Sequence, residues 1–140
     1  SIDCYATIIA PPQWDRERFA QCASVLKSLG IHYVNIQPLT PLPGTGMTLP
    51  DEEIIISRDD YAKWDLAHVT VRPEHLTVSA FYRELVKVYD TVLFQPGVLL
   101  RYLIQYSPSQ LWKMARGSFL VRQQYERKIR EALRFEKSGR

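Results

Sequence analysis

The 140-residue chain has only two cysteines, and no long uncharged hydrophobic run. Cys4 and Cys22 stand 18 residues apart with no CxxC or HxxxH pattern nearby, so we expect two reduced, buried thiols rather than a disulfide or a metal site. No apolar stretch approaches the roughly 18 residues that a membrane span needs, and no stretch has the layout of a signal peptide. The sequence therefore predicts a soluble, cytoplasmic protein with no membrane partner.

Familiar catalytic motifs are also absent. No Ser-His-Asp, HExxH, GxGxxG or P-loop pattern occurs, and Gly44-Thr45-Gly46 lacks the lysine of a phosphate-binding loop. The polar pair that most suggests chemistry is Asp65 with His68, because an i, i+3 spacing lets a carboxylate orient an imidazole. A purely structural hydrogen-bonded pair is the favoured alternative to a catalytic one, and we predict no metal site.

Charge is divided unevenly along the chain. Residues 1–70 carry 5 basic and 9 acidic side chains, whereas residues 71–140 carry 13 basic and 6 acidic ones. A basic half can attract nucleic acid or another anionic surface. Acidic residues at 126, 131 and 136 interleave with the basic ones, however, which favours a solvated face or contact with an acidic partner domain.

An α/β pattern opens the chain. Residues 2–10 are β-branched and nearly continuously apolar, which predicts a strand buried on both faces. An amphipathic helix follows, with Asp15 as its N-cap and Gly30 as its C-terminal signal. Residues 31–37 alternate with period two and predict a second strand. Strand, helix and strand in this order form a β-α-β unit, whose two strands must be parallel.

The second strand runs into a proline-rich segment that includes Pro38, Pro41 and Pro43. Proline fixes φ and removes an N–H, so we expect a loop with a single extended backbone conformation. The remaining backbone groups, at Leu39, Thr40 and Leu42, must then find partners elsewhere, and a ligand edge is one candidate. In parallel α/β folds, chemistry sits at this carboxyl end of the strands.

The rest of the chain is predicted to be mostly helical. A brief strand is expected over residues 54–57, and helices over 77–92, with Thr77 as a capping residue, and over 98–106, 108–116 and 119–135. Aromatic residues recur along these helices, and their spacing favours core packing over a nucleic-acid stacking surface. The aromatic residues considered are Tyr82, Tyr89, Tyr102, Tyr106, Trp112 and Phe119.

Three stretches carry a family resemblance when taken together. They are Pro11-Pro12-Gln13-Trp14-Asp15-Arg16 after the first strand, Leu39-Thr40-Pro41-Leu42-Pro43-Gly44-Thr45 after the second, and Asp65-x-x-His68 downstream. In this order they resemble the C-terminal portion of radical S-adenosylmethionine (radical SAM) enzymes, especially members with a cobalamin-binding domain. The resemblance implies a β-α-β piece of a partial parallel β/α (TIM-like) barrel followed by a C-terminal helical extension. Residues 1–72 would supply the last strands and helix of the barrel, and residues 73–140 the extension.

The resemblance also implies cofactor contacts. The family's Gly-x-Ile-x-Gly pattern, which lies against the adenine of S-adenosylmethionine, falls on Ala6, Ile8 and Ala10, so only Ile8 carries over. The end of the next strand usually offers backbone groups to the adenine edge, which by position means Gln37, Leu39 and Thr40. The implied cofactors of the full-length enzyme are S-adenosylmethionine, a 4Fe-4S cluster and, in the members with that domain, cobalamin.

One departure from the family limits what this chain can do. The cluster needs three cysteines in a CxxxCxxC motif, which this sequence lacks. We therefore expect an enzyme fragment that is inactive alone, binds no cofactor alone, and is partnered by the missing N-terminal part of the same enzyme. Open sheet edges would favour self-association of the fragment. The alternative is a non-catalytic interaction domain that binds nucleic acid or an acidic protein through its basic C-terminal helices.

Overall fold

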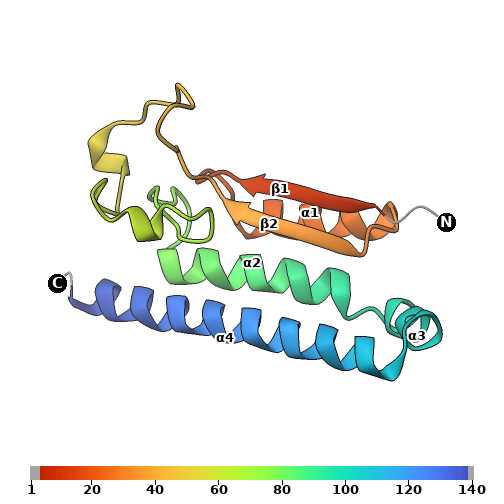
Figure 1. Ribbon diagram of the computed structural model, residues 1–140. Helices are drawn as coiled ribbons and strands as arrows, with labels where there is room; N and C mark the ends of the chain where they lie inside the picture. Colours follow the sequence, from red (N-terminus) through yellow and green to blue (C-terminus); the bar gives the residue numbers. More distant parts are fainter. Residues whose placement is uncertain (1–3, 139–140) are drawn as a thin grey trace.

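A computed structural model describes residues 4–138 and shows a two-stranded sheet resting on a layer of helices (Figure 1). Two short 3₁₀ helices lie in the long connection that leaves the sheet. In chain order, the elements of residues 4–138 are β1 (Tyr5–Ala10), α1 (Arg16–Ser28), β2 (Tyr33–Pro38), η1 (Asp51–Glu53), η2 (Tyr61–Lys63), α2 (Val78–Leu93), α3 (Pro96–Gln105) and α4 (Pro108–Ser138). No helix in this part of the chain is long and apolar enough to cross a membrane.

The predicted β-α-β unit is present and its strands are parallel, with Tyr5 opposite Tyr33 and Ala10 opposite Pro38. The two strands run side by side in Figure 1. The first residues of the predicted strand, 2 and 3, lie outside the described residues. Asp15 caps α1 as predicted, because its carboxylate accepts a hydrogen bond of 2.8 Å from the Arg18 N–H.

Gly30 ends α1 and turns the chain toward β2. Its φ of +66° is a left-handed conformation that favours glycine. Its N–H donates to the Lys27 carbonyl, and the next N–H, from Ile31, donates to the Leu26 carbonyl. These two bonds are those of a Schellman motif, which satisfies carbonyls that a helix end would otherwise leave unpaired. The predicted stop is therefore confirmed.

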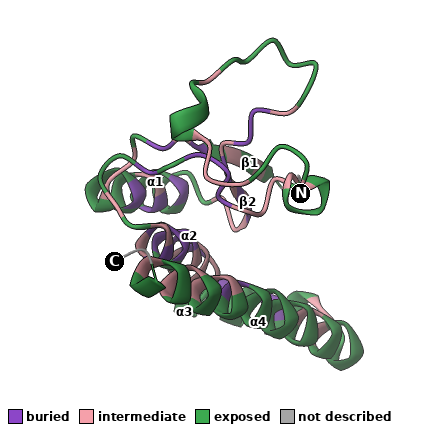
Figure 2. Ribbon diagram, turned by 90° about the vertical axis from the view of Figure 1, so that its left-hand side faces the viewer, coloured by how far each residue is buried: buried purple, intermediate pink, exposed green. Residues whose placement is uncertain are grey.

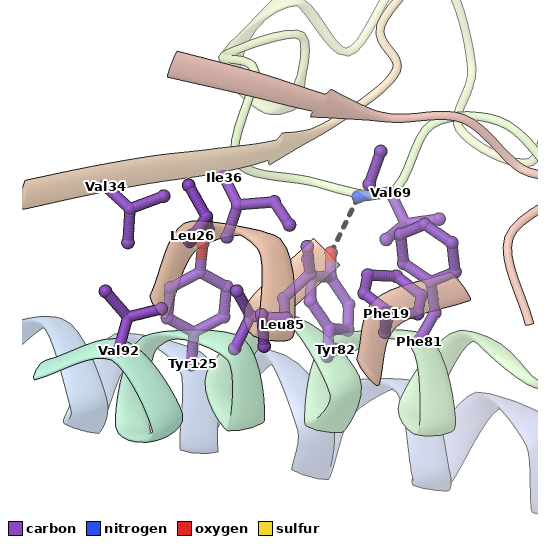
Figure 3. Packing of buried hydrophobic residues seen from close by; sticks show 13 residues of the cluster. Phe19, Leu26, Val34, Ile36, Val69, Phe81, Tyr82, Leu85, Val92 and Tyr125 are labelled. Carbon is purple, nitrogen blue, oxygen red and sulfur yellow. Dashed lines mark hydrogen bonds between the residues drawn. The ribbon is translucent and has the colours of Figure 1, made fainter. Parts of the chain in front are cut away.

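One face of the sheet is buried, whereas the other is exposed along β1 and half-buried along β2. Val34 and Ile36 of β2 are buried, and they pack with Phe19 and Leu26 of α1 and with Leu85 of α2. Figure 3 shows these side chains meeting between the strands and the helices. The alternate residues of β1 are exposed, so β1 is not buried on both faces as its composition predicts. Figure 2 shows the corresponding burial of the helices, with buried residues on the sides of α1 and α2 that face the core.

Helix α2 runs along the outer edge of β2. Thr77 caps it as predicted, accepting a hydrogen bond of 3.2 Å from the Ala80 N–H. The Tyr89 hydroxyl accepts the Ile36 N–H at 3.1 Å and lies 3.2 Å from the Ile36 carbonyl oxygen. A side-chain hydroxyl thus occupies the edge position that a further strand would otherwise pair with.

Helix α4 is continuous from Pro108 to Ser138, so the prediction of two helices, over residues 108–116 and 119–135, is wrong. A glycine inside a helix costs only about 1 kcal/mol relative to alanine. Packing of α4 against α2 offsets that cost, with Tyr125 buried between them. The Glu136 carboxylate also accepts bonds of 2.9 Å from the Ser79 N–H and hydroxyl, where it meets the positive end of the α2 dipole.

Two other predicted boundaries shift. Helix α3 begins at Pro96, two residues before the predicted start, because proline suits the first turn of a helix. The brief strand expected over residues 54–57 reduces to one antiparallel bridge between Ile54 and Val71. Both proposed segments, 1–72 and 73–140, contribute side chains to a single hydrophobic core.

Candidate functional site

The carboxyl ends of β1 and β2 are partly covered by the chain itself. The Leu39 N–H donates to the Ala10 carbonyl at 2.9 Å, and the Leu42 N–H donates to the Thr40 carbonyl at 2.9 Å. The Leu39 carbonyl accepts the Thr70 hydroxyl at 3.4 Å. Among residues 4–138, the Thr40 N–H makes no hydrogen bond although Thr40 is buried. Of the three backbone positions expected to seek partners, Thr40 therefore keeps a free donor.

Ile8 and Gln37 lie on opposite faces of the sheet. Ile8 packs against the hydrophobic core, together with Ala6. Gln37 stands opposite Ile9 in the register, on the other face, where Ile9 is 56% exposed and Gln37 is half-buried. Side chains alternate between faces along a strand, so Ile9 rather than Ile8 accompanies Gln37 on the open face.

Asp65 and His68 are in direct contact, as their spacing allows. Asp65 Oδ1 lies 2.8 Å from His68 Nδ1 and accepts bonds of 2.9 Å from the Ala67 and His68 N–H groups. Leu66, between them, has a φ of +62°, which is uncommon for a residue other than glycine. The three bonds to one carboxylate oxygen hold this turn in place.

Residues from α2 and α4 surround the Asp65 turn. The Tyr82 hydroxyl accepts the Val69 N–H at 2.8 Å, the bond drawn dashed in Figure 3. Burial raises the pKa of Tyr82 to about 12, although the Val69 bond opposes the shift. The charge of Lys128, from α4, acts on Asp65. Burial lowers the pKa of Lys128, opposed by the charges of Asp65 and Glu131.

The electrostatic interactions of Asp65 favour a structural role for the Asp65–His68 pair over a catalytic one. Burial raises its pKa, but the hydrogen bonds from His68 and the Ala67 backbone and the charge of Lys128 outweigh burial, so the net pKa is lowered. A carboxylate with a lowered pKa stays ionised at neutral pH and is a weak proton acceptor. The arrangement therefore orients a turn more readily than it transfers a proton.

A cavity of about 310 Å³ lies beside this turn, between β2 and α4. Its size is at the lower end of the range for small-molecule sites. Burial raises the pKa of both Tyr89 and Tyr125, so their hydroxyls stay protonated at neutral pH. Polar groups from distant parts of the chain meet here, which suits a ligand that carries both donors and acceptors. The polar lining residues are Tyr5, Asn35, Tyr89, Gln124, Tyr125 and Lys128.

Metal-ligating residues do not gather in the described part of the chain. No group of three His, Cys, Asp or Glu side chains is close enough to hold an ion in residues 4–138. Both cysteines are free thiols, but Cys4 is exposed and Cys22 half-buried on α1, so the prediction that both are buried is wrong for Cys4. Burial raises the pKa of Cys22, which weakens it as a thiolate ligand. These residues therefore do not fit a 4Fe-4S cluster.

The prediction that the aromatic residues pack in the core is only partly right. Core packing is right for Tyr82 and wrong for Trp112 and Phe119, which are 62% and 60% exposed. The cavity-lining residues Tyr125 and Lys128 were missed. Their i, i+3 spacing on one helix was visible, but the strand residues that complete the cavity were not near them in sequence.

Comparison with known proteins gives one informative match. Over 85 residues, 61% of this chain, the sequence is 36% identical to the hopanoid C-3 methylase of Methylococcus capsulatus. The aligned part covers 16% of that relative, so this chain spans a small fraction of its length. No protein-family model and no solved structure matches this sequence.

Proposed function

We propose that this chain is part of a radical SAM enzyme, in which it forms one wall of the cofactor pocket. The observation that carries the proposal is a parallel β1–α1–β2 unit whose second sheet face is exposed along β1. The motif resemblance and the similarity to a methylase over 61% of the chain support it.

The free edge of β1 supports the proposal of a partial barrel. The Ala10 carbonyl accepts the Leu39 N–H and therefore points toward β2. Backbone N–H and C=O groups alternate sides along a strand, so those of Tyr5, Thr7 and Ile9 point away from β2. Tyr5 and Ile9 are 66% and 56% exposed. A further parallel strand can pair with this edge and extend the sheet toward a TIM-like barrel.

S-adenosylmethionine would lie at the open face, near the strand ends. The free Thr40 N–H supplies a donor, and the Gln37 carboxamide supplies a donor and an acceptor, which suits the edge of an adenine ring. Leu39 is already paired, and Ile8 faces the core, so Ile9 is the apolar side chain positioned to contact a ring on this face.

The iron–sulfur cluster must come from another part of the polypeptide, because the described residues do not fit one. In enzymes of this family the cluster supplies the electron that cleaves S-adenosylmethionine. Within the whole enzyme this chain would orient the nucleoside, whereas alone it would bind no cofactor and would be inactive. Since the similar protein is a methylase, methyl transfer is the first reaction to assay, with cobalamin as a further cofactor.

The test compares the 140-residue chain with the polypeptide extended by its upstream coding sequence. After anaerobic reconstitution with iron and sulfide, the extended protein should convert S-adenosylmethionine to 5′-deoxyadenosine under reducing conditions. The chain of this sequence should not. An upstream sequence without CxxxCxxC, or a reconstituted protein that takes up no cluster, would overturn the proposal.

A matched pair of variants tests whether this chain contacts S-adenosylmethionine. In the extended protein, Gln37→Ala should weaken S-adenosylmethionine binding about fivefold, the effect of roughly one hydrogen bond. Gln21→Ala, on the exposed surface of α1, should leave binding unchanged. Isothermal titration measures both, and equal affinities for the two variants would place the nucleoside elsewhere.

A further inference from the structure

Helix α3 exposes aliphatic side chains where a surface helix usually carries polar ones. Val98 and Tyr102 are buried toward the protein. Four neighbouring positions face outward, with exposures of 42%, 59%, 66% and 80% for Leu99, Leu100, Leu103 and Ile104. Apolar residues gathered in this way mark an interaction surface rather than ordinary solvent exposure.

The first half of α4 continues this apolar character beside α3, against which it packs. Trp112 and Phe119 are seven residues apart, so they lie on one side of the helix. Both are mostly exposed, and the Arg116 guanidinium lies 5.5 Å from the Trp112 ring centroid. Aromatic rings with adjacent arginines are typical of surfaces that sit at the boundary between lipid and water.

The charge around these residues has one sign. Residues 91–125 contain four basic side chains and no acidic one, whereas residues 126–138 contain three glutamates among the basic residues. Of the four, Arg122 already pairs with Asp90 at 3.3 Å. Lys113 and Arg116 give the exposed apolar residues a positive border, which is complementary to an anionic surface.

We propose that the α3–α4 surface binds the face of an anionic lipid membrane; this surface comprises Leu99, Leu100, Leu103, Ile104, Trp112 and Phe119. The ten residues of α3 extend about 15 Å, roughly half the hydrocarbon thickness, so the helix lies in the plane of the interface. The expectation of no membrane partner rested on the lack of a spanning segment, and peripheral binding needs none. The proposal does not depend on the radical SAM assignment.

Vesicle flotation tests it with the 140-residue chain. The chain should float with vesicles of phosphatidylcholine mixed with phosphatidylglycerol, and much less with phosphatidylcholine alone. Raising the salt from about 0.1 M to about 0.5 M should weaken binding, because surface charges are then screened. Brominated lipids should quench fluorescence, and Trp112→Phe should remove most of the quenching.

Paired variants distinguish binding through the α3–α4 surface from nonspecific hydrophobic adsorption. Leu103→Glu with Ile104→Glu should lower vesicle binding at least about tenfold, since two apolar side chains no longer enter the lipid. Lys113→Gln with Arg116→Gln should lower it on anionic vesicles alone. Phe135→Glu is the matched control, because Phe135 is equally exposed, at 73%, but lies in the mixed-charge end of α4.

Three outcomes would overturn the proposal. In the first, the chain binds no vesicles, or Phe135→Glu lowers binding as much as the α3 variant does. In the second, the chain binds no vesicles, and light scattering shows a dimer that the α3 variant dissociates. The α3–α4 surface would then bind a second copy of this chain. In the third, the chain binds single-stranded RNA instead of vesicles through the same basic residues.

Discussion

Helices α2 and α3 follow each other directly, and both are rich in aliphatic residues, yet they use them in opposite ways. Helix α2 buries Phe81, Leu85, Val88 and Val92 against α1, the sheet and α4. Helix α3 buries two side chains and leaves four aliphatic ones exposed. The same residue types therefore stabilise the fold in one helix and remain available for binding in the next.

Leu85→Ala should give the largest effect, because Leu85 is fully buried in the core. Removing a buried leucine side chain costs about 2–5 kcal/mol through lost transfer free energy and the cavity left behind. Urea unfolding followed by circular dichroism measures the change in the free energy of unfolding. A loss under about 1 kcal/mol would mean that α2 is not the centre of the core.

Tyr82→Phe should give a smaller loss from the same helix. It keeps the ring but removes the hydroxyl that accepts the Val69 N–H at 2.8 Å, leaving a buried donor without its partner. Such a donor costs about 1–3 kcal/mol. The urea midpoint should fall with little change in the slope, whereas an unchanged midpoint would show that water reaches the Val69 N–H.

Asp65→Asn should show a pH-dependent effect of at most about 1 kcal/mol, since the Asp65 side chain is 41% exposed and solvent screens its electrostatic interactions. The pKa of Asp65 is lowered in the folded protein from its ordinary value of 3.8. Its contribution is therefore fully present above that value and is lost as the pH falls through the folded-state pKa.

The asparagine variant keeps a side-chain oxygen for the two N–H groups of the turn, which makes it a matched control for geometry. The difference in unfolding free energy between wild type and variant should shrink as the pH is lowered from about 5.5 to about 2.5. A difference that grows toward acid pH would contradict the lowered pKa.

Leu103→Ala should give the smallest effect, within about 0.5 kcal/mol, because Leu103 is 66% exposed on α3. Paired with Leu85→Ala, it makes the same chemical change in a packed and an unpacked helix. A loss above about 1 kcal/mol in the isolated chain would show that α3 packs against another part of it, and would remove the basis of the membrane proposal.

Local features of the fold were predictable because they depend on neighbours in the chain. The two parallel strands, the Asp15 and Thr77 caps and the Gly30 stop all follow from short stretches of sequence, and each is confirmed. The break before Pro96 was also visible, although proline starts α3 instead of preceding it.

The candidate site was predictable only in outline. Contact between Asp65 and His68 follows from their spacing, but the Lys128 charge that acts on Asp65 comes from a residue 63 positions later in the chain. Which sheet face is open also needed the structure, because the burial of Ile8 and the exposure of Ile9 depend on where α1 and α2 pack.

By itself, the sequence determined the strand–helix–strand order, the Asp15 and Thr77 caps and the Gly30 stop, since caps, glycine stops and periodicity act within a few residues. Only the tertiary structure decided that α4 continues through Gly117, that Trp112 and Phe119 face outward, and that Thr40 keeps a free N–H. The reason is physical: packing and hydrogen-bond satisfaction depend on segments distant in the chain, and their arrangement is set by the whole core.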